Sequence, residues 1–149
     1  MSCNKECRDK NLPEIECLDG YDLIENIYIQ RGGNTIGLFY GLKPTYLIND
    51  DSTYNAPSPF WYKPFDTIDF ATKTLLGVEF SSPYGIGVGY QSFLCHNSST
   101  KTWTYTVNYV MIDKCDGEGA GCSIWMLCPK IPDTDTVIFE VININPFSD

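Results

Sequence analysis

The feature that most constrains the fold is a run of alternating side chains at residues 102–112, in which only the last even positions, Val110 and Ile112, are apolar. Its odd positions carry aromatic or apolar side chains, and its even positions are mostly threonine or asparagine. Because successive side chains of a strand point to opposite faces, this pattern predicts a strand with one face in a core and one polar face. The residues expected to share the core face are Trp103, Tyr105, Val107, Tyr109 and Met111.

Shorter runs of β-branched, aromatic and aliphatic residues recur along the chain, separated by turn residues at intervals of about 8–12 residues. The first two runs flank a turn at residues 31–34 and predict a hairpin. No helices alternate with these runs, so we expect an all-β, mainly antiparallel fold, either a β-sandwich or a jelly roll. Besides residues 102–112, the expected strands are residues 23–29 and 35–40, which form the hairpin, and residues 45–48, 78–81, 85–94, 122–128 and 137–144.

Two segments do not fit a strand pattern as clearly. Residues 49–65 contain three prolines and predict a long connection. Residues 68–76 place apolar side chains at helical spacing before Gly77, whereas their threonines favour a strand. We therefore expect at most one or two short helices, with one of them in this second segment.

The length of the chain, 149 residues, fits one domain. Apolar residues make up 43% of the sequence and aromatic residues 14%, which is enough material for a packed core. Residues 1–20 are charged and carry little apolar periodicity, so they predict an extended N-terminal arm. Residues 21–149 are then the single β-sandwich domain.

The formal charge of −9, from 10 basic and 19 acidic residues, bears on the partners. Nucleic acids and anionic membranes both attract clustered positive charge, and no segment is basic, so we expect neither partner. No apolar stretch has the length of a signal peptide or the roughly 18 residues of a membrane helix. The expected location is a virion or, alternatively, the cytoplasm.

The seven cysteines are odd in number, so at least one is unpaired within the chain. In a reducing cytosol free thiols or a metal site are the default expectation. Cys3, Cys7 and Cys17 are weak candidates for a zinc site because only the first two approach the usual ligand spacing.

Cys115 and Cys122 flank a glycine-rich stretch that could close a hairpin. Residues opposed across the neck of a hairpin lie close enough for a disulfide, so this pair is the best-supported bridge in an oxidising environment. Asp113, Asp116 and Glu118 are weak candidates for calcium ligands, but a solvated turn explains them better. No cofactor is expected.

The chain carries no recognisable catalytic signature. His96, the single histidine, directly follows Cys95, and adjacent strand residues point to opposite faces. His96 is therefore expected to be an ordinary residue at the edge of a loop, and we expect no enzyme activity.

Aromatic side chains gather in the proline-rich connection. Exposed, they would suit contact with a partner protein or a sugar ring, and folded back they would cover one end of the sandwich. These candidates are Phe60, Trp61, Tyr62 and Phe65.

The function expected first is that of a non-enzymatic structural protein of a large assembly, such as a capsid, decoration or tail protein of a virus or phage. Its partners would be other subunits of the same assembly, including copies of itself, with a trimer among the arrangements considered. Two alternatives stay open: a carbohydrate- or ligand-binding β-sandwich module, and a small hydrolase.

Overall fold

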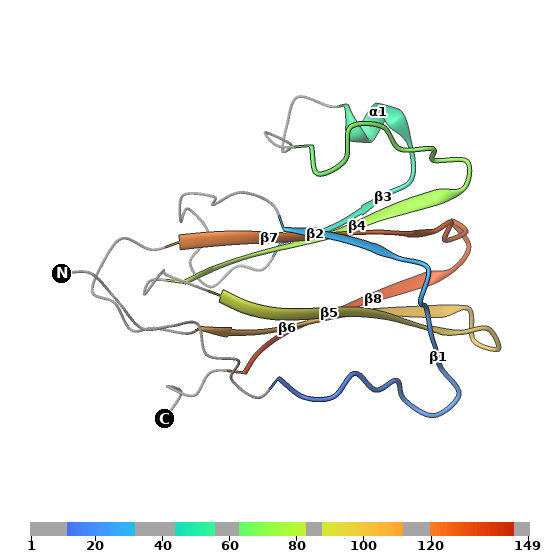
Figure 1. Cartoon of the computed structure of the whole chain (residues 1–149). Helices are drawn as coiled ribbons and strands as arrows, with labels where there is room; N and C mark the ends of the chain where they lie inside the picture. Colours follow the sequence, from blue (N-terminus) through green and yellow to red (C-terminus); the bar gives the residue numbers. More distant parts are fainter. Residues whose placement is uncertain (1–11, 32–43, 56–62, 83–87, 112–119, 145–149) are drawn as a thin grey trace.

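A computed structural model describes residues 12–31, 44–55, 63–82, 88–111 and 120–144 (Figure 1). Within these ranges it contains eight strands and one short helix. In chain order they are β1 (Asp22–Leu23), β2 (Tyr28–Arg31), β3 (Thr45–Ile48), α1 (Asp51–Tyr54), β4 (Lys73–Ser82), β5 (Val88–Asn97), β6 (Thr102–Met111), β7 (Ala120–Pro129) and β8 (Thr136–Asn143).

The strands form two four-stranded sheets that stack as the two layers of a β-sandwich (Figure 1). The arm sheet has the order β1-β5-β6-β8, and the helix sheet has the order β2-β7-β4-β3. Neighbouring strands pair antiparallel except β6 and β8, which pair parallel. The prediction of an all-β, mainly antiparallel fold is confirmed, whereas jelly-roll connectivity stays a prediction.

The alternation expected from residue 102 onward forms β6 (Thr102–Met111), a strand with one core face. Tyr105 and Val107 of β6 have no exposed surface, and Trp103 and Tyr109 are buried beside them. Leu94 lies opposite Tyr105 on β5 and points into the same layer. The main core between the sheets is completed by Leu76, Val78, Phe80, Ile124, Met126, Cys128 and Ile131.

The central strands of the helix sheet are buried on both faces. Leu76 faces the main core, while its neighbour Leu75 faces a second cluster on the outer side of the sheet. The expected helix over residues 68–76 is therefore wrong, since residues 73–82 form β4. Adjacent buried leucines mark a strand covered on both faces, which a helical periodicity can imitate over a short segment.

The first expected strand, residues 23–29, is divided between the two sheets. β1 pairs with β5 in the arm sheet, and β2 pairs with β7 in the helix sheet. Between them the chain climbs from one layer to the other, and Ile24 and Ile27 pack against the main core as it does so (Figure 1). The expected partner strand at residues 35–40, and with it the predicted hairpin, lie outside the described residues.

Helix α1 falls inside the segment expected to be a connection. Its N-cap is Asp50, whose carboxylate accepts a hydrogen bond from the backbone N–H of Thr53 at 2.7 Å. That bond lowers the pKa of Asp50. Asp50 therefore stabilises the first turn of α1, which lies above the helix sheet.

Candidate functional site

The outer face of the arm sheet is a grid of mostly polar side chains. Side chains that sit opposite one another in the strand register share a face, so three rows run from β5 across β6 to β8. The rows are Gln91–Asn108–Ile142, Phe93–Thr106–Glu140 and Cys95–Thr104–Ile138.

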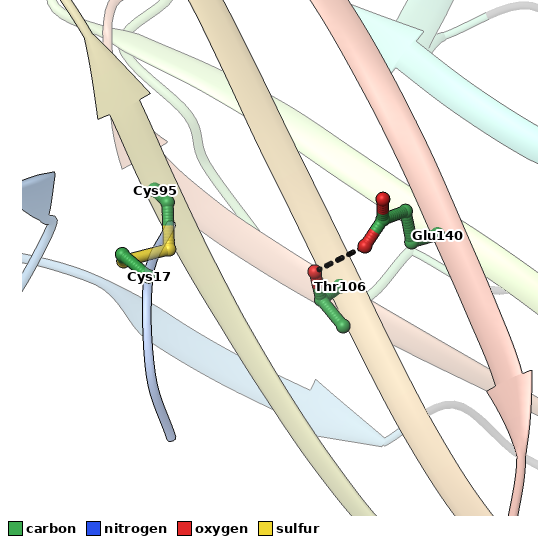
Figure 2. Close-up of a disulfide and its surroundings, with 4 residues drawn as sticks. All are labelled: Cys17, Cys95, Thr106 and Glu140. Carbon is green, nitrogen blue, oxygen red and sulfur yellow. Dashed lines mark hydrogen bonds between the residues drawn. A yellow bond between two sulfur atoms is a disulfide. The ribbon is translucent and has the colours of Figure 1, made fainter. Parts of the chain in front are cut away.

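Hydrogen bonds join the strands along two of these rows. The amide of Asn108 donates to the side-chain oxygen of Gln91 at 3.1 Å, and the Thr106 hydroxyl donates to the Glu140 carboxylate at 3.4 Å (Figure 2). Thr106 and Asn108 are nevertheless buried. The outer face of a two-sheet sandwich is thus partly shielded from water here.

The arm segment, residues 12–20, lies over the β5 side of this grid (Figure 1). A disulfide joins Cys17 of the arm segment to Cys95 of β5, two residues that stand 78 positions apart in the sequence (Figure 2). The side chain of Gln91 donates to the carbonyl of Pro13 at 2.8 Å. The two attachments hold the arm segment along β5 on either side of Phe93.

The outer face of the helix sheet is covered by α1 together with residues 63–72, which we call the lid. Its aromatic and aliphatic side chains pack directly on the sheet and form the second hydrophobic cluster, in which Phe65 takes part. The backbone N–H of Phe65 also donates to the Tyr54 hydroxyl at 3.2 Å. The buried members of this cluster are Ile48, Tyr54, Ile68, Phe70, Leu75 and Trp125.

The position of the Trp125 ring requires a glycine at the opposite position on the neighbouring strand. Gly77 lies directly opposite it, and a Cβ built on Gly77 would stand 2.3 Å from a ring carbon of Trp125. The indole also stacks on Tyr46, which lies opposite Gly77 on β3, with ring centroids 5.4 Å apart. Only a residue without a side chain lets the indole lie flat across β4.

A half-buried carboxylate ends this row of aromatic contacts. The Tyr46 hydroxyl donates to Glu79, and burial together with the nearby carboxylate raises the pKa of Tyr46 to about 12. Burial also raises the pKa of Glu79, although the hydrogen bond from Tyr46 works in the opposite direction. This pair is a polar element at the border of an otherwise apolar face.

His96 and Cys95 point to opposite faces of β5, as expected. The imidazole stacks on Trp103 with ring centroids 3.7 Å apart, and the Trp103 indole N–H donates to Asp135 at 2.9 Å. Cys95 is bonded to Cys17 on the other face. A dyad of this histidine and this cysteine is therefore not formed, and the sulfur is not a free nucleophile.

The expectation of free thiols is wrong for Cys17 and Cys95 but holds for Cys128. The Cys128 thiol donates to the carbonyl of Thr74 at 3.4 Å, and burial raises its pKa to about 12. A sulfur in a disulfide is not a thiolate ligand, so in this form Cys17 does not serve the proposed zinc site. Its expected companions Cys3 and Cys7 lie outside the described residues.

Several other expected site residues also lie outside the described part of the chain. These are Phe60, Trp61, Tyr62, Asp113, Cys115, Asp116, Glu118 and the side chain of Cys122. Phe65 is the described member of the aromatic loop, and it packs inward against the lid cluster. Where the structure describes the chain, no three histidine, cysteine or acidic side chains gather closely enough to hold a metal ion.

All large hydrophobic side chains that are exposed in the described residues lie on the arm segment or on the outermost strands. None of them belongs to β4, β5, β6 or β7, the four central strands. They are Ile15, Leu18, Leu23, Tyr28, Ile29, Leu47, Ile138 and Ile142.

Sequence reasoning missed both the disulfide and this distribution. No local signal pairs two cysteines that stand 78 residues apart, and an apolar residue does not reveal whether its strand is central or outermost.

No helix in the described ranges is long and apolar enough to cross a membrane. Comparisons with protein-family models, with curated proteins and with solved structures give no match.

Proposed function

We propose that this protein is a non-enzymatic structural component of a large assembly, of the kind that builds a virus or phage particle. Its outermost strands and its arm contact neighbouring subunits, including further copies of the same chain. The observation that carries the proposal is the confinement of the exposed large hydrophobic side chains to these elements.

Outermost strands are the places where a β-protein meets other chains. Lone domains commonly protect them with charges, prolines or short length, because apolar strand borders invite association. Here β8 is eight residues long and exposes Ile138 and Ile142 on one face, with Glu140 between them. Apolar side chains in these positions support a surface that is covered in the working state.

The negative charge shapes how copies would associate. Each carries a formal charge of −9, so like-charged subunits repel one another at low ionic strength. Screening shortens this repulsion to about 10 Å at 0.1 M salt, while apolar contacts are not weakened. Association of copies is therefore expected to increase with salt.

The test is light scattering coupled to size exclusion over a range of protein and salt concentrations. We expect oligomers of the unmodified chain, and a monomer when Ile138→Lys and Ile142→Lys are combined. The matched control combines Thr136→Lys and Asn143→Lys, two exposed positions at the ends of the same strand that change the net charge equally. This control should retain the oligomer.

A second measurement uses the protein from its native source. Sedimentation with intact particles supports the proposal. A chain that stays monomeric at every concentration and salt, and that does not sediment with particles, would contradict it.

A further inference from the structure

The arm segment differs from every strand beneath it in how it is held. Residues 12–18 form no regular secondary structure, and a turn follows them, closed by a hydrogen bond from the N–H of Tyr21 to the carbonyl of Leu18 at 3.0 Å. Leu18 is 74% exposed. The arm segment therefore contributes little apolar burial of its own to the fold.

One hydrogen bond and one covalent bond join residues 12–18 to the arm sheet in the part of the chain that the structure describes. One is the exposed hydrogen bond from Gln91 to the carbonyl of Pro13, and the other is the bond between Cys17 and Cys95. An exposed hydrogen bond competes with water and holds a chain weakly. The covalent bond is the attachment that keeps the arm segment in place.

The surface beneath the arm segment is covered as if it belonged to a core. Phe93 and Cys95 are outer-face residues of β5, yet they are only 8% and 4% exposed. Phe93 lies between the two attachment points, Gln91 and Cys95. Because the arm segment is attached on both sides of Phe93, we infer that it shields this ring from water.

The chain that follows the arm segment is held more firmly than the arm segment itself. Gly20 follows the arm segment with a φ of +85°, a conformation that favours glycine, and β1 then pairs with β5 through two residues. Beyond β1, the N–H of Ile24 donates to the carbonyl of Leu94 at 2.9 Å. The chain is therefore anchored after Gly20, so this turn is the natural pivot for the segment before it.

From these observations we infer that the disulfide is a redox-operated strap. Closed, it holds residues 12–18 over Phe93. A dithiol reductant supplies two electrons and two protons, which cleave the S–S bond to the thiols of Cys17 and Cys95 while the reductant closes to its own disulfide. Reduction releases the arm segment about Gly20 and adds Phe93 to the exposed apolar surface, whereas the two sheets stay folded.

The opening of the strap does not depend on the proposed function and is measured on the isolated chain. The variant Cys17→Ser opens it without altering β5, and Cys128→Ser is the matched control because that cysteine is buried and free. The first readout is cleavage by a glutamate-specific protease at the exposed residues Glu14 and Glu16. We expect cleavage at least about tenfold faster in Cys17→Ser, or in the reduced protein, than in the oxidised protein or in Cys128→Ser.

The second readout is alkylation of the freed cysteine. Because the pKa of Cys128 is about 12 against an ordinary 9.0, its thiolate is about 10³-fold scarcer at neutral pH, and it serves as the internal slow standard. In Cys17→Ser, Cys95 should be alkylated at least about 10²-fold faster than Cys128 while tryptophan fluorescence stays native. Equal cleavage in all forms, Cys95 alkylation as slow as that of Cys128, or loss of the native fluorescence on reduction would each overturn the strap.

Discussion

The two outer faces of the sandwich are covered in opposite ways. On the helix sheet, the lid of α1 and residues 63–72 buries aromatic and aliphatic side chains against an apolar face, with no covalent bond among its described contacts. On the arm sheet, the face mixes polar side chains with a few apolar ones, and the arm segment above it is fastened by a disulfide. An apolar face holds its cover by excluding water, whereas a polar face offers little such gain.

This difference has a consequence for which cover can move. Removing the lid would expose an entire hydrophobic cluster, so the lid is part of the folded state. On the inference above, release of the arm segment adds one ring, that of Phe93, to the exposed surface, which is a smaller apolar area than a whole cluster. A cover held by one reversible bond is the one suited to release.

The largest expected effect contrasts one residue from each cover. Phe70→Ala removes a buried ring of the lid cluster and should lower the free energy of unfolding by about 3–5 kcal/mol. Leu18→Ala shortens an exposed side chain of the arm segment and should change it by less than about 0.5 kcal/mol. Urea denaturation measures both values, and similar costs at the two sites would break the contrast.

An intermediate effect tests how tightly the helix sheet is packed beneath its lid. Gly77→Ala places a methyl group where the Trp125 ring lies, so it should cost about 1–3 kcal/mol in urea denaturation. Combining it with Trp125→Leu removes the ring carbons that the methyl group meets. The double variant should then lose clearly less than the sum of the two single losses, and strict additivity would argue against the clash.

The smallest effect concerns the polar border of the same face. Because burial raises the pKa of Glu79, the folded protein holds this proton more tightly than the unfolded chain does. The contribution to stability is therefore present below the ordinary value of 4.5 and is lost as the pH rises through the raised native pKa.

The matching variant is Glu79→Gln, which stays neutral and can still accept the hydrogen bond from Tyr46. Its free energy of unfolding, relative to that of the unmodified chain, should rise as the pH is raised from 4.5 to neutrality. Glu140→Gln, at an exposed carboxylate on the arm sheet, is the control. An unchanged difference between Glu79→Gln and the unmodified chain across this range would contradict the assignment.

Local pattern was a reliable guide where one face of a strand is buried and the other is not. Trp103, Tyr105, Val107 and Tyr109 of β6 point into the main core, because they alternate with polar residues that lie on the outer face of the strand. The same reasoning failed for residues 68–76, since Leu75 and Leu76 are both buried in a strand that has a core on each side. The pattern also predicted one strand where the structure has β1 and β2. The residues that cross between the two sheets are apolar because they pack against the core, so the sequence shows no break there.

The candidate functional features depended more heavily on position in space. The adjacency of Cys95 and His96 correctly implied opposite faces, which follows from strand geometry alone. The partner of Cys95 had no signature in sequence. The exposed isoleucines of β8 look in sequence like those of any buried strand. They are surface residues because they lie on the outer face of an outermost strand, which only the tertiary structure decides.

By itself the sequence determined the class of fold, the core face of its clearest strand and the absence of a basic stretch, because these follow from side-chain periodicity and charge. The tertiary structure alone decided which strands lie outermost, which cysteines meet and which outer face carries a packed lid. These properties arise from contacts between segments far apart in the chain. The free energy of such contacts depends on where the chain brings its surfaces together, and no local pattern encodes that.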